Sequence, residues 1–114
     1  AASDVYKRQT YTTAEGRLDN LNARFREHTC KLFEKHGMTN VGYWTPIDNN
    51  KGSANTLIYI ISHKSPEQAK KNWKGFISDS DWKKARAKSV EDGKILAIAP
   101  EKIFLDAVDY SLIK

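Results

Sequence analysis

The stretch from Phe25 to Trp44, FREHTCKLFEKHGMTNVGYW, decides the fold of this 114-residue chain. Its first half continues an amphipathic helix, because apolar residues recur at steps of three and four from Leu18 onward. Gly37 predicts the end of that helix, since glycine adopts the left-handed conformation at a helix C-terminus without a Cβ clash. The residues after Gly37 begin a strand, so the chain passes from helix to strand with almost no connecting loop.

Strands are predicted on both sides of this stretch. Val5 to Thr12 contains several strand-favouring side chains. Thr39 to Ile47 and Thr56 to His63 predict a hairpin, because residues 48–53 between them are rich in turn-forming types. A last strand is predicted after Pro100, where residues of two faces alternate.

Two helices are predicted between the hairpin and the last strand. Ser65 is placed as the N-cap of the first, with Pro66 in its first turn and Gln68 completing a capping box. Its predicted buried stripe consists of Ala69, Trp73, Phe76 and Ile77. Residues 79–81 then restart a shorter helix that is predicted to end near Gly93.

The element order β-α-β-β-α-(α)-β predicts an α+β, ferredoxin-like domain over residues 1–114, with helices on one face of an antiparallel sheet. Both faces of the predicted strand Thr56 to His63 are largely apolar. In so small a protein the second face needs a cover as well. A symmetric homodimer is predicted, in which two sheets pack face to face about a two-fold axis.

Composition narrows the classes of function. The net charge is +5, but the lysines of the predicted helices alternate with apolar positions as on a solvated face, so nucleic-acid binding is not expected. No apolar run approaches the roughly 20 residues of a membrane span. A signal peptide is not evident, and the single cysteine suits a reducing compartment, so a cytoplasmic location is predicted.

Five segments form a combined pattern: Tyr11-Thr12-Thr13, the run from Phe33 to Met38, Gly42-Tyr43-Trp44, the run from Asn55 to Ile60, and Asp79-Ser80-Asp81-Trp82. This pattern resembles the NIPSNAP family, from about Tyr11 to Ser111. The resemblance implies the dimeric α/β barrel fold and a bacterial type of member, whose molecular function is mostly uncharacterised. Eukaryotic relatives are mitochondrial and are linked to vesicle traffic and mitochondrial quality control.

The beginning of the chain departs from the family. The first strand of the family usually has Leu where this chain has Arg8, and Arg where it has Gln9. The middle of this strand is polar, which predicts either a wet face or a position at the sheet edge. Residues 1–9 are therefore hypothesised to be non-native.

Polar and aromatic side chains on otherwise apolar faces are the candidate pocket residues. In the functional interpretation, His28 or His63 acts as a general base. Tyr59 orients the substrate and Trp73 stacks on an aromatic ligand. In the competing interpretation these are satisfied core or rim groups, just as His36 is expected to cap its own helix. The candidate pocket residues are His28, Tyr43, Tyr59, His63 and Trp73.

Other chemistries lack a signature. The spacing of the three histidines does not match a metal site, and Cys30 is expected on the solvated side of its helix. No cofactor is predicted, and the Asn that haem-degrading relatives place on the first strand is missing from residues 5–12. We therefore predict a small-ligand or partner-binding homodimer, with a small apolar or aromatic ligand. The alternative is a cofactor-independent monooxygenase or isomerase-type enzyme, and the sequence leaves open whether the protein is an enzyme.

Overall fold

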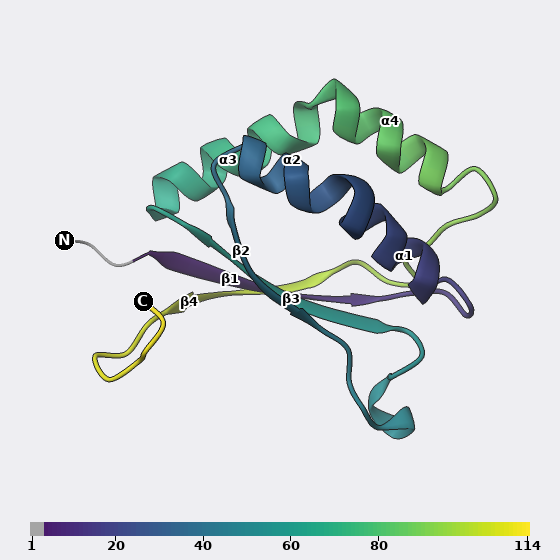
Figure 1. Ribbon diagram of the computed structural model, residues 1–114, viewed down its shortest axis with the longest axis horizontal. Helices are drawn as coiled ribbons and strands as arrows, with labels where there is room; N and C mark the ends of the chain where they lie inside the picture. The colour runs from purple at the N-terminus through teal and green to yellow at the C-terminus, as the bar shows by residue number, and fades with distance from the viewer. Residues whose placement is uncertain (1–3) are drawn as a thin grey trace.

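A computed structural model describes residues 4–114 and shows a twisted antiparallel sheet with all long helices on one face (Figure 1). The strands pair in the order β2-β3-β1-β4, which is the ferredoxin-like order, so the predicted α+β fold class is confirmed. Residues 1–3, the start of the segment hypothesised to be non-native, lie outside the described residues. The strands are β1 (Val5–Thr12), β2 (Thr39–Trp44), β3 (Thr56–His63) and β4 (Glu101–Asp106).

Strand β1 lies inside the sheet, between β3 and β4, so the edge position considered from its polar middle is wrong. Its alternate residues Lys7, Gln9 and Tyr11 are buried on the face that the helices cover. Arg8 points to the other face, where its guanidinium lies 3.3 Å from the carboxylate of Glu101. The polar middle of β1 therefore places two polar side chains beneath the helices.

The helical run that precedes Gly37 forms as predicted, with one wide turn inside it. It consists of α1 (Leu18–Arg24), a π-helical turn (Phe25–Thr29) and α2 (Cys30–Lys35). Gly37 has a φ of 84°, and a Cβ there would lie 2.9 Å from the Asn72 side chain, so only glycine fits. The expectation for Cys30 is wrong, because its half-buried side chain packs against the core where the wide turn rotates the helix.

Two helices follow β3: α3 (Pro66–Ser78) and α4 (Ser80–Ser89). The Oγ of Ser65 accepts a hydrogen bond from the Gln68 backbone N–H at 3.0 Å, as predicted for the N-cap. The capping box does not close, because the Gln68 side chain donates to Asn72 at 2.8 Å instead.

Asp79 joins the ends of three helices. Its Oδ1 accepts hydrogen bonds from the backbone N–H groups at the start of α4, as an N-cap does. Its Oδ2 lies 2.6 Å from Nε2 of His36 and 2.8 Å from Nζ of Lys35, at the end of α2. His36 is the C-cap of α2, as expected, and its side chain reaches across to Asp79.

The core between sheet and helices is built from aromatic rings. Tyr59 on β3 is fully buried and packs against Phe25, with ring centroids 5.1 Å apart. Phe33 of α2 lies 4.8 Å from Phe76 of α3, ring centroid to ring centroid. This layer joins the sheet to both helical segments, and one side of it opens onto the site described below.

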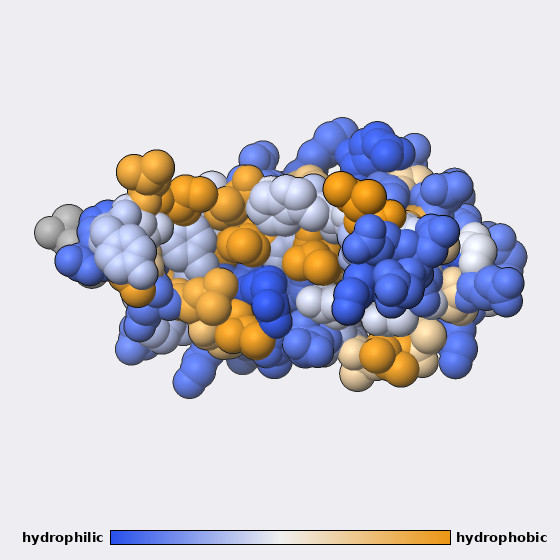
Figure 2. All heavy atoms as spheres, turned by 90° about the horizontal axis from the view of Figure 1, so that it is seen from below, coloured by the Kyte–Doolittle hydropathy of each residue, from blue (hydrophilic) through white to orange (hydrophobic). Residues whose placement is uncertain are grey.

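The sheet face opposite the helices has no cover within residues 4–114. Figure 2 shows this face, with apolar side chains gathered on it. Trp44, Ile103 and Leu105 are exposed there by 52%, 41% and 38% of their surface. Strand β2 ends at Trp44, earlier than the predicted Ile47, since Pro46 has no N–H for the ladder. No helix within residues 4–114 is both long enough and apolar enough to cross a membrane.

Candidate functional site

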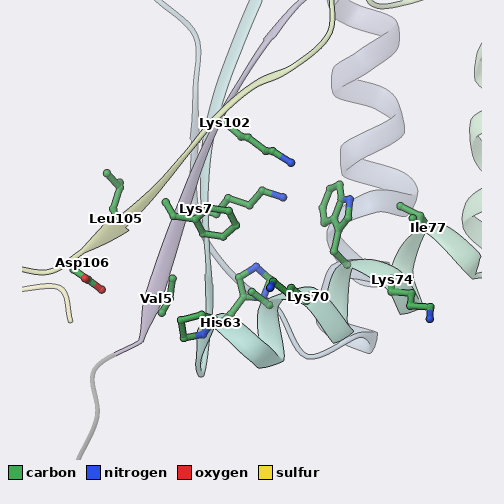
Figure 3. Close-up of a pocket in the computed structure, with 13 residues that line it drawn as sticks. Val5, Lys7, His63, Lys70, Lys74, Ile77, Lys102, Leu105 and Asp106 are labelled. Carbon is green, nitrogen blue, oxygen red and sulfur yellow. The ribbon is translucent and has the colours of Figure 1, made fainter.

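A pocket of about 620 Å³ lies between α3 and the part of the sheet formed by β1, β3 and β4 (Figure 3). Helix α3 packs against β3, whereas β4 is an edge strand whose residues are all exposed, so the pocket opens to solvent on the β4 side. Its walls are mostly apolar and aromatic, with a few charged groups. The lining residues are Val5, Lys7, His63, Pro66, Ala69, Lys70, Trp73, Lys74, Ile77, Lys102, Phe104, Leu105 and Asp106.

Lys7 is the buried charged group of this pocket, with only 4% of its surface exposed. Its Nζ lies 3.7 Å from the centre of the Trp73 ring and 5.7 Å from that of Phe104. No carboxylate among residues 4–114 forms an ion pair with it. Burial, together with the positive charge of Lys102, lowers the pKa of Lys7 to about 8.

His63 is held at the end of β3 by Asn72 of α3. The Nδ2 of Asn72 donates to the carbonyl of Gly37 at 3.2 Å and lies 3.0 Å from Nδ1 of His63. Because its Oδ1 accepts from Gln68 at 2.8 Å, the amide orientation is fixed and Nδ1 of His63 must be the acceptor. Burial and the charge of Lys7 lower the pKa of His63 to about 4, so the neutral ring carries its proton on Nε2.

Trp73 connects the pocket with the aromatic core. Its ring lies 5.9 Å from that of Phe33 and 5.2 Å from that of Phe76, and its other side faces Lys7. Phe104, opposite Lys7 in the pairing of β1 with β4, forms a second aromatic wall and is 53% exposed. The charges around the pocket are mainly positive: Lys7, Lys70, Lys74 and Lys102 against Asp106.

The structure brings together two of the predicted candidate residues, His63 and Trp73, which both line this pocket. Tyr59 and Tyr43 lie in the aromatic core instead, stacked at 5.0 Å between ring centroids. His28 is exposed in a separate groove between the π-helical turn and α4. His28, Tyr59 and His63 therefore do not share one pocket.

The hydroxyl of Tyr59 is satisfied inside the core. It accepts a hydrogen bond from Nε2 of Gln9 at 2.7 Å and lies 3.1 Å from the hydroxyl of Tyr11. Burial raises the pKa of Tyr59 well above its ordinary value, so the phenol keeps its proton. Burial raises the pKa of Tyr43 in the same direction.

Sequence reasoning missed Lys7, Lys102 and Phe104 as pocket residues. The signal was present in the polar middle of β1, where Lys7 alternates with Gln9 and Tyr11 on one face. From the sequence alone, a solvent-facing lysine and a buried lysine fit this position equally well. Only the order of the strands decides between them. Among residues 4–114 the structure holds no group of three or more His, Cys, Asp or Glu side chains that could bind a metal ion.

The sheet order and a pocket between sheet and helices define a class: small α+β proteins of the ferredoxin-like type, whose interior is shared by an aromatic core and one ligand-sized cavity. Within that class, the family model described as NIPSNAP matches residues 6–111. The chain belongs to the NIPSNAP family, and the resemblance seen in the sequence is confirmed. No curated protein sequence gives a match.

Solved structures show the same fold at low sequence identity. A NIPSNAP family protein of unknown function from Agrobacterium tumefaciens is 16% identical, with a TM-score of 0.81 over 98% of this chain and 95% of the other. An uncharacterised NIPSNAP-like domain protein from Burkholderia xenovorans is 11% identical, with a TM-score of 0.80 over 97% and 90%. A monooxygenase from Streptomyces coelicolor, in complex with nanaomycin D, is 11% identical, with a TM-score of 0.66 over 98% and 94%.

Proposed function

We propose that this NIPSNAP-family protein binds a small aromatic ligand in the pocket between α3 and the sheet, and does so as a homodimer. The observation that carries the proposal is the buried ammonium of Lys7, held 3.7 Å from the Trp73 ring in a cavity of about 620 Å³. A buried charge without an ionic partner is costly, and titratable groups perturbed in this way cluster at functional sites.

The chemistry of the walls indicates the kind of ligand. Phe104, which is 53% exposed, offers an aromatic ring to an apolar or aromatic body, and Trp73 adds apolar surface to the pocket wall. Lys7 and Lys102 offer positive charge to an oxygen-bearing end of the ligand, and Nε2–H of His63 adds a hydrogen-bond donor. An aromatic compound with a carbonyl, carboxylate or phenolate oxygen matches these features.

Binding is tested by isothermal titration calorimetry with 2-naphthoate, comparing the wild-type protein with Trp73→Leu and Lys7→Met. We expect one site per chain and at least tenfold weaker binding in both variants, equivalent to about 1.4 kcal/mol. His28→Ala, in the separate groove, serves as the matched control and keeps wild-type affinity. Binding that survives both pocket substitutions would remove the proposal.

The homodimer is proposed from the uncovered sheet face. Two such faces can bury Trp44, Ile103 and Leu105 against each other, and the structural relatives include folds of the dimeric α/β barrel type. Native mass spectrometry is expected to give a dimer for the wild-type protein and a monomer for Leu105→Glu. A wild-type monomer at micromolar concentration would contradict this part. The predicted cytoplasmic location accompanies the proposal as a further expectation.

The alternative function, a cofactor-independent monooxygenase or isomerase-type enzyme, is less well supported. The fold is shared with the Streptomyces coelicolor monooxygenase, but at 11% identity this likeness concerns the fold alone. The catalytic pair expected for it does not form, since Tyr59 is in the core and Nδ1 of His63 is occupied by Asn72. The observation that favours an enzyme lies elsewhere, at Lys7.

A further inference from the structure

Lys7 and Lys102 form a pair of amines on neighbouring strands. Lys102 is opposite Gln9 in the pairing of β1 with β4, which makes it the diagonal neighbour of Lys7 on the same face. Figure 3 shows both side chains extending from the sheet toward α3. Lys7 is buried against Trp73, whereas Lys102 is exposed at the rim of the pocket.

We propose that Lys7 is a nucleophilic amine that forms an imine with an aromatic aldehyde or ketone bound in the pocket. The proposal rests on the ligand-binding function proposed above and names the reactive class of ligand. An amine that is desolvated and lies beside a second cation is activated as a nucleophile, because both effects favour its neutral form. Lys7 meets both conditions: only 4% of its surface is exposed, and Lys102 is its diagonal neighbour on β4.

The reaction balances without any oxidant or reductant. The lone pair of the neutral Lys7 Nζ forms a C–N bond with the carbonyl carbon, and a proton passes from nitrogen to the carbonyl oxygen to give a carbinolamine. The nitrogen lone pair then forms the C=N bond as the C–O bond breaks, and the remaining N–H proton passes to the departing hydroxyl, which leaves as water. Nε2–H of His63 lines the same pocket and can donate a hydrogen bond to the carbonyl oxygen.

The charges facing Lys7 determine how the reaction depends on pH. They are Lys102 and Asp106 on β4, His63 on β3, and Lys70 and Lys74 on α3. Among them Lys102 lowers the pKa of Lys7 together with burial, to about 8. A substantial share of Lys7 is therefore neutral at mildly basic pH, where ordinary lysines are almost entirely protonated.

The test is reductive trapping with 6-methoxy-2-naphthaldehyde and cyanoborohydride, followed by intact-protein mass spectrometry and peptide mapping. At a pH near the Lys7 pKa of about 8, we expect one adduct per chain, formed at Lys7 at least tenfold faster than at any other lysine. Lys7→Arg is expected to abolish this adduct, whereas Lys71→Arg, an exposed lysine of α3, is expected to keep it. Lys102→Met should move the midpoint of the trapping rate to higher pH.

Two outcomes would overturn the proposal: equal labelling of many exposed lysines, or an undiminished total yield in Lys7→Arg. A competition experiment on the wild-type protein gives a check that does not depend on the folding of a variant. Excess 2-methoxynaphthalene, which has no carbonyl group, should slow trapping at Lys7 and leave surface labelling unchanged.

The same compound separates the two proposals. If calorimetry shows that 2-methoxynaphthalene binds in the pocket while Lys7 is not trapped, the imine is overturned and the binding function stands. If this compound and 2-naphthoate both fail to bind and no Lys7 adduct forms, both proposals fall.

Discussion

The two ends of strand β1 bury polar side chains in opposite ways. At one end, Tyr11 and Gln9 meet Tyr59, and their polar groups are joined by hydrogen bonds of 2.7 and 3.1 Å. At the other end, two residues earlier on the same face, Lys7 is buried against Trp73 without an acceptor among the described residues. The polar groups at the first end satisfy one another within the core. The ammonium of Lys7 has no such partner among the described residues, so the group that would pair with it must come from outside the fold.

The largest expected effect is a loss of stability when the aromatic core, rather than the pocket, is substituted. Phe33→Ala removes a fully buried ring that contacts Tyr59, Trp73 and Phe76, so the free energy of unfolding should fall by about 3–5 kcal/mol. Urea denaturation measures this change, with the exposed Ile47→Ala expected to stay within about 0.5 kcal/mol of wild type. A loss below about 1 kcal/mol would mean that the aromatic layer is not the stabilising core.

The next effect concerns Asn72 of α3, which connects the residue after α2 with the end of β3 beside the pocket. Asn72→Ala removes the partner of His63, Gly37 and Gln68 and should cost about 2 kcal/mol, because buried groups lose their hydrogen bonds. The neighbouring exposed Lys71→Ala is the matched control. Nitrogen NMR of the imidazole should show the Nε2–H tautomer of His63 in the wild-type protein and a mixture in the variant. An unchanged tautomer would show that Asn72 does not orient the ring.

The most specific effect is the pH dependence of stability that Lys7 causes. Because folding lowers its pKa from 10.5 to about 8, the unfolded chain holds about one proton more than the folded chain between these values. Stability should therefore rise with pH across that window through this residue. In Lys7→Met that contribution disappears, as chemical denaturation at several pH values can measure. Equal slopes in both proteins would place Lys7 in solvent.

His63 also makes the stability of the protein rise with pH, but over a lower pH range than Lys7 does. Its folded pKa of about 4 lies below the ordinary 6.5, so the unfolded chain takes up a proton first as the pH falls. Stability should therefore decrease from pH 6.5 to 4, and less so in His63→Gln. A steeper acid loss in His63→Gln than in wild type would contradict the assigned environment.

Local patterns in the sequence predict most of this fold. The N-cap at Ser65, the helix end at Gly37 and the range of β3 are local decisions, and the structure has them where they were predicted. The central position of β1 is decided by pairing with β3 and β4, which are distant in sequence, and was therefore not foreseeable from its polar middle.

The site was less accessible to sequence reasoning for the same reason. His63 and Trp73 stood out as a polar and an aromatic side chain on apolar faces, and both line the pocket. Lys7 and Lys102 become a pair only once β1 and β4 are adjacent, and a lysine on an isolated strand gives no sign of burial. Tyr59 was predicted from the same pattern as His63, but its partners in the core come from β1 and could not be read locally.

The most direct measurement is the pKa of Lys7. It is obtained by NMR of the protein with isotope-labelled lysine over a range of pH, and the Lys7 signal is assigned from the Lys7→Arg variant. A buried, unpaired amine beside Trp73 and Lys102 should titrate at about 8, well below the usual lysine pKa of about 10.4. A Lys7 midpoint near that usual value would show that the ammonium is hydrated or paired. The distinction between the two ends of β1 would then fail, and the proposed pocket chemistry with it.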